Sequence, residues 1–420
     1  MRKKVLIMER LILHSDLNCF YASVECLLNP SYRDRPVAVC GDPEKRHGIV
    51  VAKNYIAKAF GVNTGDTVWQ AKKKCPDLAL FPARFDKYKY YSEMARRIYY
   101  EYTNLVEPYG LDEAWLDISR RDGDYEYAFK TAEEISGRIK NELGLTVSIG
   151  VSFTKSFAKL GSDYKKPDAI TVITPDNYKK IVWPLGVSNL IYVGKATEKT
   201  LLSLGIHTIG DLAAADEGTI KNRLGKNGER LRLWANGADN DPVRDYMDRP
   251  TAKSIGNSVT LPYDITSDED ISVVLMALAE KVASRLREKR LMCSSVQIDI
   301  KGRELTTATV RKKLSYPTCV AGDIYNAAVE LIKTKRRRPV RALGIRAESL
   351  ESSDMVQLSL EADFARSMKQ LKLEEALDGI RKKYGNGSVK RGIMLLNIDL
   401  SELGASSAGG DASAETPYLI

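Results

Sequence analysis

The sequence predicts an α/β protein of several domains. Its 420 residues are more than one ordinary domain contains. Hydrophobic residues make up 44% of the chain and charged residues 28%, which is typical of globular proteins. Segments with strand and helix patterns alternate over residues 1–185 and again over 253–350, and short helical segments lie between them. We therefore expect a mixed α/β unit, a helical unit and a second α/β unit.

The first α/β unit is predicted from short apolar runs separated by helical periodicity. Proline and glycine set its boundaries: Pro108 is expected to close one helix, and Gly144 to end another. A strand pair is expected on either side of Asp112. The other expected strands are 11–17, 37–40, 48–52, 145–152 and 169–173, and the expected helices are 20–28, 55–60, 67–74, 85–107, 125–143 and 156–164.

The rest of the chain is predicted by the same signals. Short helices with glycine turns are expected over 187–237, followed by a linker at 246–250. The second α/β unit should contain a first strand after residue 253, helices 268–289 and 324–335, and strands 296–301, 306–314 and 340–349. An amphipathic helix is expected at 365–384, and the Ala/Ser/Gly-rich stretch 404–416 is expected to be disordered.

Charge and cysteine usage restrict the class of protein. The net charge is +9, and residues 253–346 alone carry 18 Lys and Arg against 10 Asp and Glu. Such a basic unit indicates binding to a polyanion, although a solvated lysine-rich surface is the alternative.

The six cysteines form no CxxC pair, which favours a reducing cytoplasm without disulfides or zinc. No apolar run is long enough to span a membrane, and residues 1–13 do not have the pattern of a signal peptide.

Three carboxylates carry the strongest chemical signal. Asp112 and Glu113 are adjacent beside a short apolar strand, and Asp16 ends another predicted strand. Like charges held together are costly unless a cation lies between them. Two divalent ions on phosphate oxygens are what an in-line phosphoryl or nucleotidyl transfer requires, and Mg²⁺ prefers such carboxylate ligands. An acidic hairpin turn without metal is the alternative for the pair alone, but it leaves Asp16 unexplained.

Three segments resemble the motifs of Y-family translesion DNA polymerases: Asp16–Glu25, Leu111–Ser119 and Ser152–Pro167. The resemblance extends over residues 11–395. Lys58 and Gly61–Asp66 point to the bacterial UmuC-like members, which act in UV-damage repair. The resemblance implies a right-hand polymerase fold and a low-fidelity, template-directed DNA polymerase of the SOS response to DNA damage.

The resemblance also assigns roles to individual residues. Asp16, Asp112 and Glu113, with the backbone carbonyl of Leu17, would bind two Mg²⁺ ions. Tyr21 would be the steric gate that excludes a ribose 2′-hydroxyl, and Phe20 beside it would also bind the dNTP. Contacts to the dNTP triphosphate are implied for Tyr55, Lys58 and Lys166, whereas Lys155 and Lys159 are expected to serve solubility or backbone contacts.

The domain boundaries follow from the same resemblance. The palm would be 1–21 and 85–187, the fingers 22–84, the thumb 188–245, the little finger 252–350, and a C-terminal extension 351–420. The thumb segment Ile191–Ile206 resembles a helix-hairpin-helix, whose backbone N–H groups can bind DNA phosphates. The extension contains Gln357, Leu358 and Leu360, which resemble a peptide that binds the bacterial sliding clamp, with Glu361 at the usual aromatic position.

Implied partners are primer-template DNA, dNTP, a sliding clamp and a UmuD-like accessory subunit, and the chain is expected to be a monomer. Two alternatives remain open. One is a different two-metal nucleotidyl enzyme on a palm-like fold, such as a nucleotidyl cyclase. The other is a catalytically inactive relative that only binds DNA. Neither accounts for the carboxylates, Tyr21, Lys166 and the basic C-terminal unit together.

Overall fold

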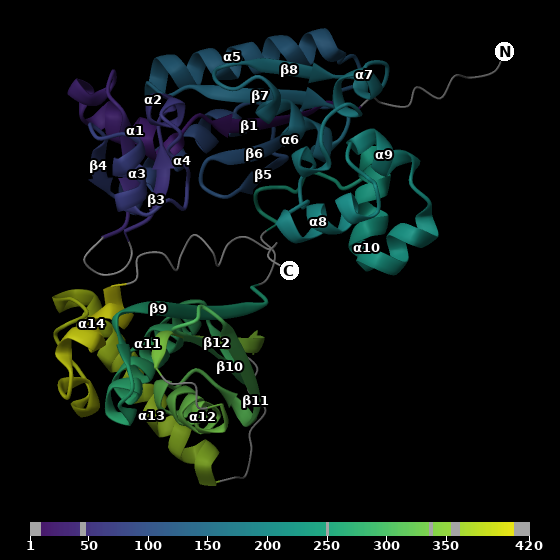
Figure 1. Ribbon diagram of the computed structural model, residues 1–420. Helices are drawn as coiled ribbons and strands as arrows, with labels where there is room; N and C mark the ends of the chain where they lie inside the picture. Colours follow the sequence, from purple (N-terminus) through teal and green to yellow (C-terminus); the bar gives the residue numbers. More distant parts are fainter. Residues whose placement is uncertain (1–9, 43–47, 249–251, 336–338, 354–361, 407–420) are drawn as a thin grey trace. The chain divides into compact units, whose positions relative to one another are not determined.

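The computed structural model describes the whole chain except residues 1–9, 43–47, 249–251, 336–338, 354–361 and 407–420. The chain forms two compact units (Figure 1). The first consists of Met1–Gly41 and Ile49–Arg249, and the second consists of Asp42–Gly48 and Pro250–Ile420. Each unit has a hydrophobic core of its own, which confirms the predicted α/β multidomain class.

A five-stranded sheet forms the centre of the first unit (Figure 1). Its strand order is β5-β6-β1-β7-β8, and all neighbours are antiparallel except β7 and β8. β1 is the central strand, and all six of its residues are buried. The strands are β1 (Ile12–Leu17), β5 (Val106–Tyr109), β6 (Glu113–Asp117), β7 (Val147–Ser152) and β8 (Ile170–Ile173).

Different helices cover the two faces of this sheet, because successive side chains of a strand point to opposite sides. Leu13 belongs to the core that includes residues of α4 and α5. The neighbouring His14 contacts Ser162 of α6. Asp16 lies two residues beyond His14, so its side chain is on the α6 face as well. The helices are α4 (Phe85–Tyr100), α5 (Tyr125–Leu143) and α6 (Lys155–Tyr164).

One predicted helix of this unit was wrong in length. The helix expected over 85–107 ends at Tyr100, and Pro108 lies inside β5. Proline lacks a backbone N–H, but β5 is an edge strand of the sheet, where a missing donor is tolerated. A turn separates helix and strand, in which the hydroxyl of Thr103 accepts a 3.1 Å hydrogen bond from the backbone of Leu105.

A smaller three-stranded sheet, in the order β3-β2-β4, completes the N-terminal part of the unit. Asn54 anchors α2 to this sheet. Its side-chain oxygen accepts hydrogen bonds from the backbone N–H groups of Ala57, at 2.9 Å, and Val37, at 3.1 Å. The elements are α1 (Phe20–Leu28), η1 (Pro30–Tyr32), β2 (Val37–Cys40), β3 (Val50–Lys53), α2 (Tyr55–Ala59), α3 (Val68–Lys74) and β4 (Ala79–Pro82).

The segment that follows β8 is helical, as predicted, and has a separate core around the fully buried Leu201, Ile209 and Leu231. Gly194 is the N-cap of α8, at the turn that the sequence relates to a helix-hairpin-helix. The elements are α7 (Tyr178–Val182), η2 (Val187–Asn189), α8 (Lys195–Ser203), α9 (Ile209–Ala214) and α10 (Glu217–Ala235).

The second unit is an antiparallel four-stranded sheet in the order β11-β10-β12-β9, packed against helices (Figure 1). Along β11, exposed side chains alternate with half-buried ones, so one face of this edge strand remains open to solvent. The elements are β9 (Ser254–Ile265), α11 (Asp268–Glu288), β10 (Leu291–Gly302), β11 (Thr307–Thr318), α12 (Ala321–Thr334) and β12 (Val340–Ser352).

The chain beyond residue 361 returns to this unit. Leu400 is completely buried in its core. The guanidinium of Arg287 on α11 donates to the carboxylates of Asp378, at 2.6 and 3.0 Å, and Glu374. The stretch predicted to be disordered begins inside the last helix, and its remainder, after Ser406, lies outside the described residues. The elements are α13 (Ala362–Tyr384), η3 (Gly392–Leu395) and α14 (Ile398–Ser406). Among the described helices, none has the length and apolar character needed to cross a membrane.

Gly150 of β7 allows α6 to approach the sheet closely. A Cβ atom at this position would lie 1.9 Å from the carbonyl oxygen of Ala158 and 2.5 Å from the backbone nitrogen of Ser162. We therefore expect Gly150→Ala to displace α6 and to lower the free energy of unfolding by about 3 kcal/mol. Gly137→Ala on α5 is the control: a Cβ there meets no atom within 4 Å, and we expect a gain of about 0.5–1 kcal/mol. Urea unfolding of the two variants measures both changes, and equal stabilities would contradict the close approach.

Candidate active site

Asp16, Asp112 and Glu113 converge where β1 ends. Asp16 and Glu113 are direct partners in the β1–β6 ladder. Asp112 lies in the turn between β5 and β6, and its backbone carbonyl accepts a 2.9 Å hydrogen bond from the N–H of Leu17. The adjacent acidic pair therefore lies at a hairpin turn and also supplies two of the three carboxylates of the cluster, because the hairpin places the pair next to Asp16.

Burial and neighbouring negative charge raise the pKa values of Asp16 and Asp112. Burial, followed by the charges of Glu113 and Asp16, raises the pKa of Asp112 to about 7. Burial and the charge of Glu113 also raise the pKa of Asp16. Carboxylates whose pKa values are raised in this way are stabilised in their ionised form by a nearby cation.

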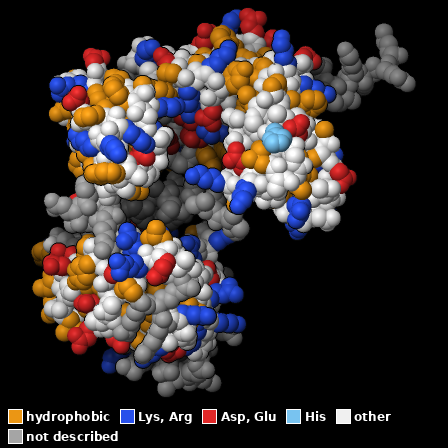
Figure 2. Space-filling model, in the orientation of Figure 1, with side chains coloured by type: hydrophobic (Ala, Val, Ile, Leu, Met, Phe, Trp, Pro, Cys, Tyr) orange, Lys and Arg blue, Asp and Glu red, His pale blue; other side chains and the backbone are white. Residues whose placement is uncertain are grey.

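Two lysines supply positive charge to this cluster. The ammonium nitrogen of Lys159 lies 2.9 Å from carboxylate oxygens of both Asp16 and Glu113, and that of Lys166 lies 2.6 Å from Asp16. Burial alone would lower the pKa of Lys159, but the charges of Glu113, Asp16 and Asp163 raise it well above its usual value. Figure 2 shows acidic and basic side chains side by side in a hollow of the first unit.

Neither Lys159 nor Lys155 serves solubility, but the expected backbone contact of Lys155 is present, because its ammonium group donates to the carbonyl oxygen of Pro242 at 3.4 Å. The side chain of Lys159 is only 14% exposed and lies between two carboxylates. The ammonium group of Lys155 is 2.6 Å from the carboxylate of Glu107 and 4.7 Å from the ring centre of Trp115. Both lysines lie on α6, whose contact with the sheet carries them inward, whereas sequence alone shows only their charge.

The donor atoms of the cluster suit a hard divalent cation. Within the described ranges, no three His, Cys, Asp or Glu side chains form a ready-made metal cluster. The ammonium of Lys159 fills the position between Asp16 and Glu113 that a cation would take. Oxygen ligands alone, with raised pKa values, fit Mg²⁺ or a similar ion. The residues that would hold it are Asp16, Asp112 and Glu113, with the carbonyl of Leu17.

The predicted steric gate, Tyr21, is held by a second tyrosine. The rings of Tyr21 and Tyr88 are stacked, with centres 4.2 Å apart and planes 11° from parallel. The hydroxyl of Tyr88 donates a 2.7 Å hydrogen bond to the fully buried Glu25, which also pairs with Arg84. Burial and the charge of Asp112 raise the pKa of Tyr21 to about 12.

Phe20 is placed differently from its neighbour Tyr21. Its side chain is 2% exposed and belongs to the core of the first unit. Its ring therefore packs beneath the site and is not open to a ligand.

Tyr55 and Lys58 lie together on α2. The hydroxyl of Tyr55 donates to the side-chain oxygen of Asn18 at 3.2 Å, and Asn18 in turn accepts a 2.9 Å bond from the hydroxyl of Ser148 on β7. The ammonium of Lys58 lies 5.7 Å from the ring centre of Tyr55. This chain of contacts joins α2 to the strands next to the carboxylates.

Two further residues of the cluster, His14 and Asp163, were not predicted from the sequence. His14 is fully buried, and its Nε2 lies 3.2 Å from a carboxylate oxygen of Glu113. Its pKa is held well below the usual value by burial and then by Lys159. Asp163 pairs with both Lys159 and Lys166. Strand alternation from Asp16 could have indicated His14, and spacings of four and three residues from Lys159 and Lys166 could have indicated Asp163.

The predicted clamp-binding residues Gln357, Leu358 and Leu360 lie outside the described residues.

Comparison with known proteins gives consistent matches. The impB/mucB/samB family model matches residues 15–163, and the model of the impB/mucB/samB family C-terminal domain matches residues 252–360. The chain is 47% identical over 399 residues to DNA polymerase IV of Acetivibrio thermocellus, covering 94% of this chain and 100% of that protein. It is 40% identical over 403 residues to DNA polymerase IV 1 of Bacillus subtilis, covering 94% and 96%. Among solved structures it is similar to the Y-family DNA polymerase chimera Dbh-Dpo4(243-245)-Dbh, with a TM-score of 0.72, 25% identity, and coverage of 81% of this chain and 98% of that one.

Proposed function

This chain belongs to the impB/mucB/samB family and is a Y-family translesion DNA polymerase, in which we propose that Asp16, Asp112 and Glu113 bind two Mg²⁺ ions. Its substrates are primer-template DNA and dNTP, and the ions would serve nucleotidyl transfer. Polymerases of this family depend on divalent metal ions. The observation that carries the proposal is the convergence of the three carboxylates at the end of β1. Bound divalent ions would activate the primer 3′-hydroxyl and neutralise the triphosphate.

The surrounding residues bind and orient the nucleotide in this proposal. Lys166, Lys58 and the hydroxyl of Tyr55 hold the triphosphate, with lysines acting as point charges and not as bidentate forks. Tyr21 lies beneath the sugar, where its ring leaves no room for a 2′-hydroxyl. The primer hydroxyl then attacks the α-phosphorus, and pyrophosphate leaves.

The remaining domains are assigned by the same proposal. The palm, 1–21 and 85–187, contains the carboxylate sheet, and the fingers, 22–84, contain the small sheet with Tyr55 and Lys58. The thumb, 188–245, contains α8, α9 and α10. The second unit would be the little finger and would bind the duplex backbone through its basic surface. Since α13 and α14 pack on that unit, the extension after residue 350 would contribute to the same domain.

Low-fidelity bypass is the proposed biological task, within the cellular response to DNA damage. The small sheet and short helices of the proposed fingers provide little structure to enclose a nascent base pair. We expect the protein to extend a primer past an abasic site, with dNTP and Mg²⁺, at a rate within about 100-fold of that on an undamaged template. Primer extension on the two templates measures this ratio. Extension on the undamaged template alone would contradict the bypass role. Template-independent cyclisation of a nucleotide would favour the alternative cyclase function.

A bacterial sliding clamp is the further partner that we propose, through Gln357, Leu358 and Leu360. This proposal is supported by the resemblance of the peptide to clamp-binding segments. We also propose an accessory UmuD-like subunit, which is supported only by the resemblance of the chain to UmuC-like polymerases. Leu358→Ala should weaken retention on an immobilised clamp about tenfold, whereas Leu373→Ala, an exposed leucine of α13, should leave it unchanged. Equal retention of both variants would remove the peptide from this role.

A further inference from the structure

We propose that Asp163 is a positioning residue that draws Lys159 and Lys166 away from the catalytic carboxylates when divalent ions bind. The inference rests on the proposed metal ligands and assigns a role to a residue outside them. It concerns how the site changes from a lysine-neutralised state to a metal-bound state.

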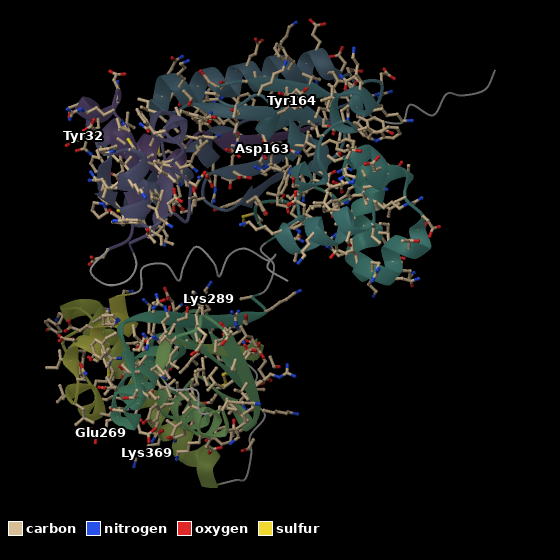
Figure 3. The ribbon with its side chains drawn as sticks, viewed as in Figure 1. Tyr32, Asp163, Tyr164, Glu269, Lys289 and Lys369 are labelled. Carbon is tan, nitrogen blue, oxygen red and sulfur yellow. The ribbon has the colours of Figure 1, made fainter. Side chains whose placement is uncertain are left out.

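Asp163, which Figure 3 labels, lies in the last turn of α6 and contacts both lysines. The ammonium of Lys159 lies 3.1 Å from one carboxylate oxygen of Asp163, and that of Lys166 lies 2.7 Å from the other oxygen. Lys159 and Asp163 are four positions apart on α6, which places them on one face of the helix, and Lys166 lies just beyond the end of the helix. One carboxylate therefore provides a separate acceptor oxygen for each ammonium group.

Lys159 has two acceptors inside the predicted metal site and one outside it, and Lys166 has one of each. Lys159 reaches Asp16 and Glu113 as well as Asp163, and Lys166 reaches Asp16 as well as Asp163. The side chain of Asp16 is 6% exposed, whereas that of Asp163 is 49% exposed. The two sets of acceptors thus lie at different depths, and a lysine can leave the inner set without losing every partner.

A divalent ion on Asp16 and Glu113 would repel both ammonium groups. Lys166 can also pair with the triphosphate, but without another acceptor the displaced ammonium of Lys159 would be partly buried and unpaired, which is strongly unfavourable. Asp163 removes that cost. Burial would raise the pKa of Asp163, but the charges of Lys159 and Lys166 outweigh it and lower the pKa, so Asp163 remains ionised to receive them.

Loss of Asp163 should therefore strengthen the competition between lysine and metal. We expect Asp163→Asn to weaken Mn²⁺ binding about tenfold, because the lysines keep only the metal-binding carboxylates as partners. Lys159→Met should tighten Mn²⁺ binding, because it removes the competing ammonium. In the Lys159→Met background, the effect of Asp163→Asn should fall below about threefold. Asp163→Glu should restore most of the affinity, since it retains a carboxylate.

The test is a titration of free Mn²⁺ by electron paramagnetic resonance. It uses the full chain with dideoxy-terminated primer-template DNA and dNTP, so no turnover is needed. Glu126→Gln is the charge-matched control, because Glu126 forms an exposed i,i+4 pair with Lys130 at 2.6 Å on α5. Thermal melting checks that each variant is folded, and Asp163→Ser provides a second neutral variant.

The outcomes separate this inference from the metal assignment. An equal loss of Mn²⁺ affinity from Asp163→Asn in both backgrounds would indicate a simple effect of charge at a distance and would overturn the positioning role. Unchanged affinity in Asp163→Asn would overturn it too. Unchanged Mn²⁺ binding in Asp112→Asn would instead overturn the proposed metal ligands, and this inference with them.

Discussion

Asp112→Asn is expected to reduce primer extension by at least about 1000-fold, which corresponds to ~4 kcal/mol of transition-state stabilisation. The amide keeps the shape of the side chain but removes the negative charge that a divalent ion requires. Because the backbone carbonyl of Asp112 bonds Leu17, the hairpin should keep its conformation in the variant. Single-turnover incorporation of one dNTP measures the loss without interference from product release.

Asp117→Asn is the matched control for this change. Asp117 lies at the other end of the same strand, β6, opposite Ile12, and its carboxylate accepts a 2.9 Å hydrogen bond from the backbone of Ser119. We expect its incorporation rate to stay within about threefold of the parent rate. Near-normal incorporation by Asp112→Asn, or equal losses in the two variants, would contradict the role of the carboxylate cluster.

Tyr21→Ala should lower the preference for dNTP over rNTP by about 100-fold or more, measured as the ratio of their kcat/KM values. The ring of Tyr21 cannot move aside for a 2′-hydroxyl, because it is stacked on Tyr88, whose hydroxyl is tied to Glu25. Removing the ring opens the space that a ribose needs. Incorporation of dNTP should decrease much less, since Tyr21 does not contribute charge to the reaction.

Tyr21→Phe separates the ring from its hydroxyl. We expect this variant to retain the preference for dNTP, because exclusion depends on the volume of the ring and its stack on Tyr88. If Tyr21→Ala keeps the original preference for dNTP, the gate is formed by another residue. If Tyr21→Phe loses the preference, the hydroxyl and not the ring is responsible.

Much of the fold could be predicted from local signals. The helix Tyr125–Leu143 has the predicted bounds, because the glycine that follows it adopts the left-handed conformation that ends helices. The helix expected over 85–107 was too long, because Pro108 serves an edge strand and does not cap the helix. Whether Pro108 ends a helix or lies in an edge strand depends on the strands that pair with it, and this tertiary information is not contained in the local sequence.

The site residues, like the helices and strands, could be predicted only in part from the sequence. Asp112 and Glu113 could be predicted because adjacent carboxylates are rarely explained without a cation. Lys159 could not, because its charge is ordinary on a helix and becomes informative only when Gly150 brings α6 against the sheet. Glu374 and Leu400 are further examples: their burial follows from the return of α13 and α14 to the second unit, across many residues of chain.

Anomalous scattering from crystals of the protein with Mn²⁺, primer-template DNA and a non-hydrolysable dNTP tests the central claim most directly. We expect Mn²⁺ peaks at the carboxylates of Asp16, Asp112 and Glu113, with the ammonium of Lys159 withdrawn from between Asp16 and Glu113. Mn²⁺ bound only elsewhere, with Lys159 still between these two carboxylates, would contradict it.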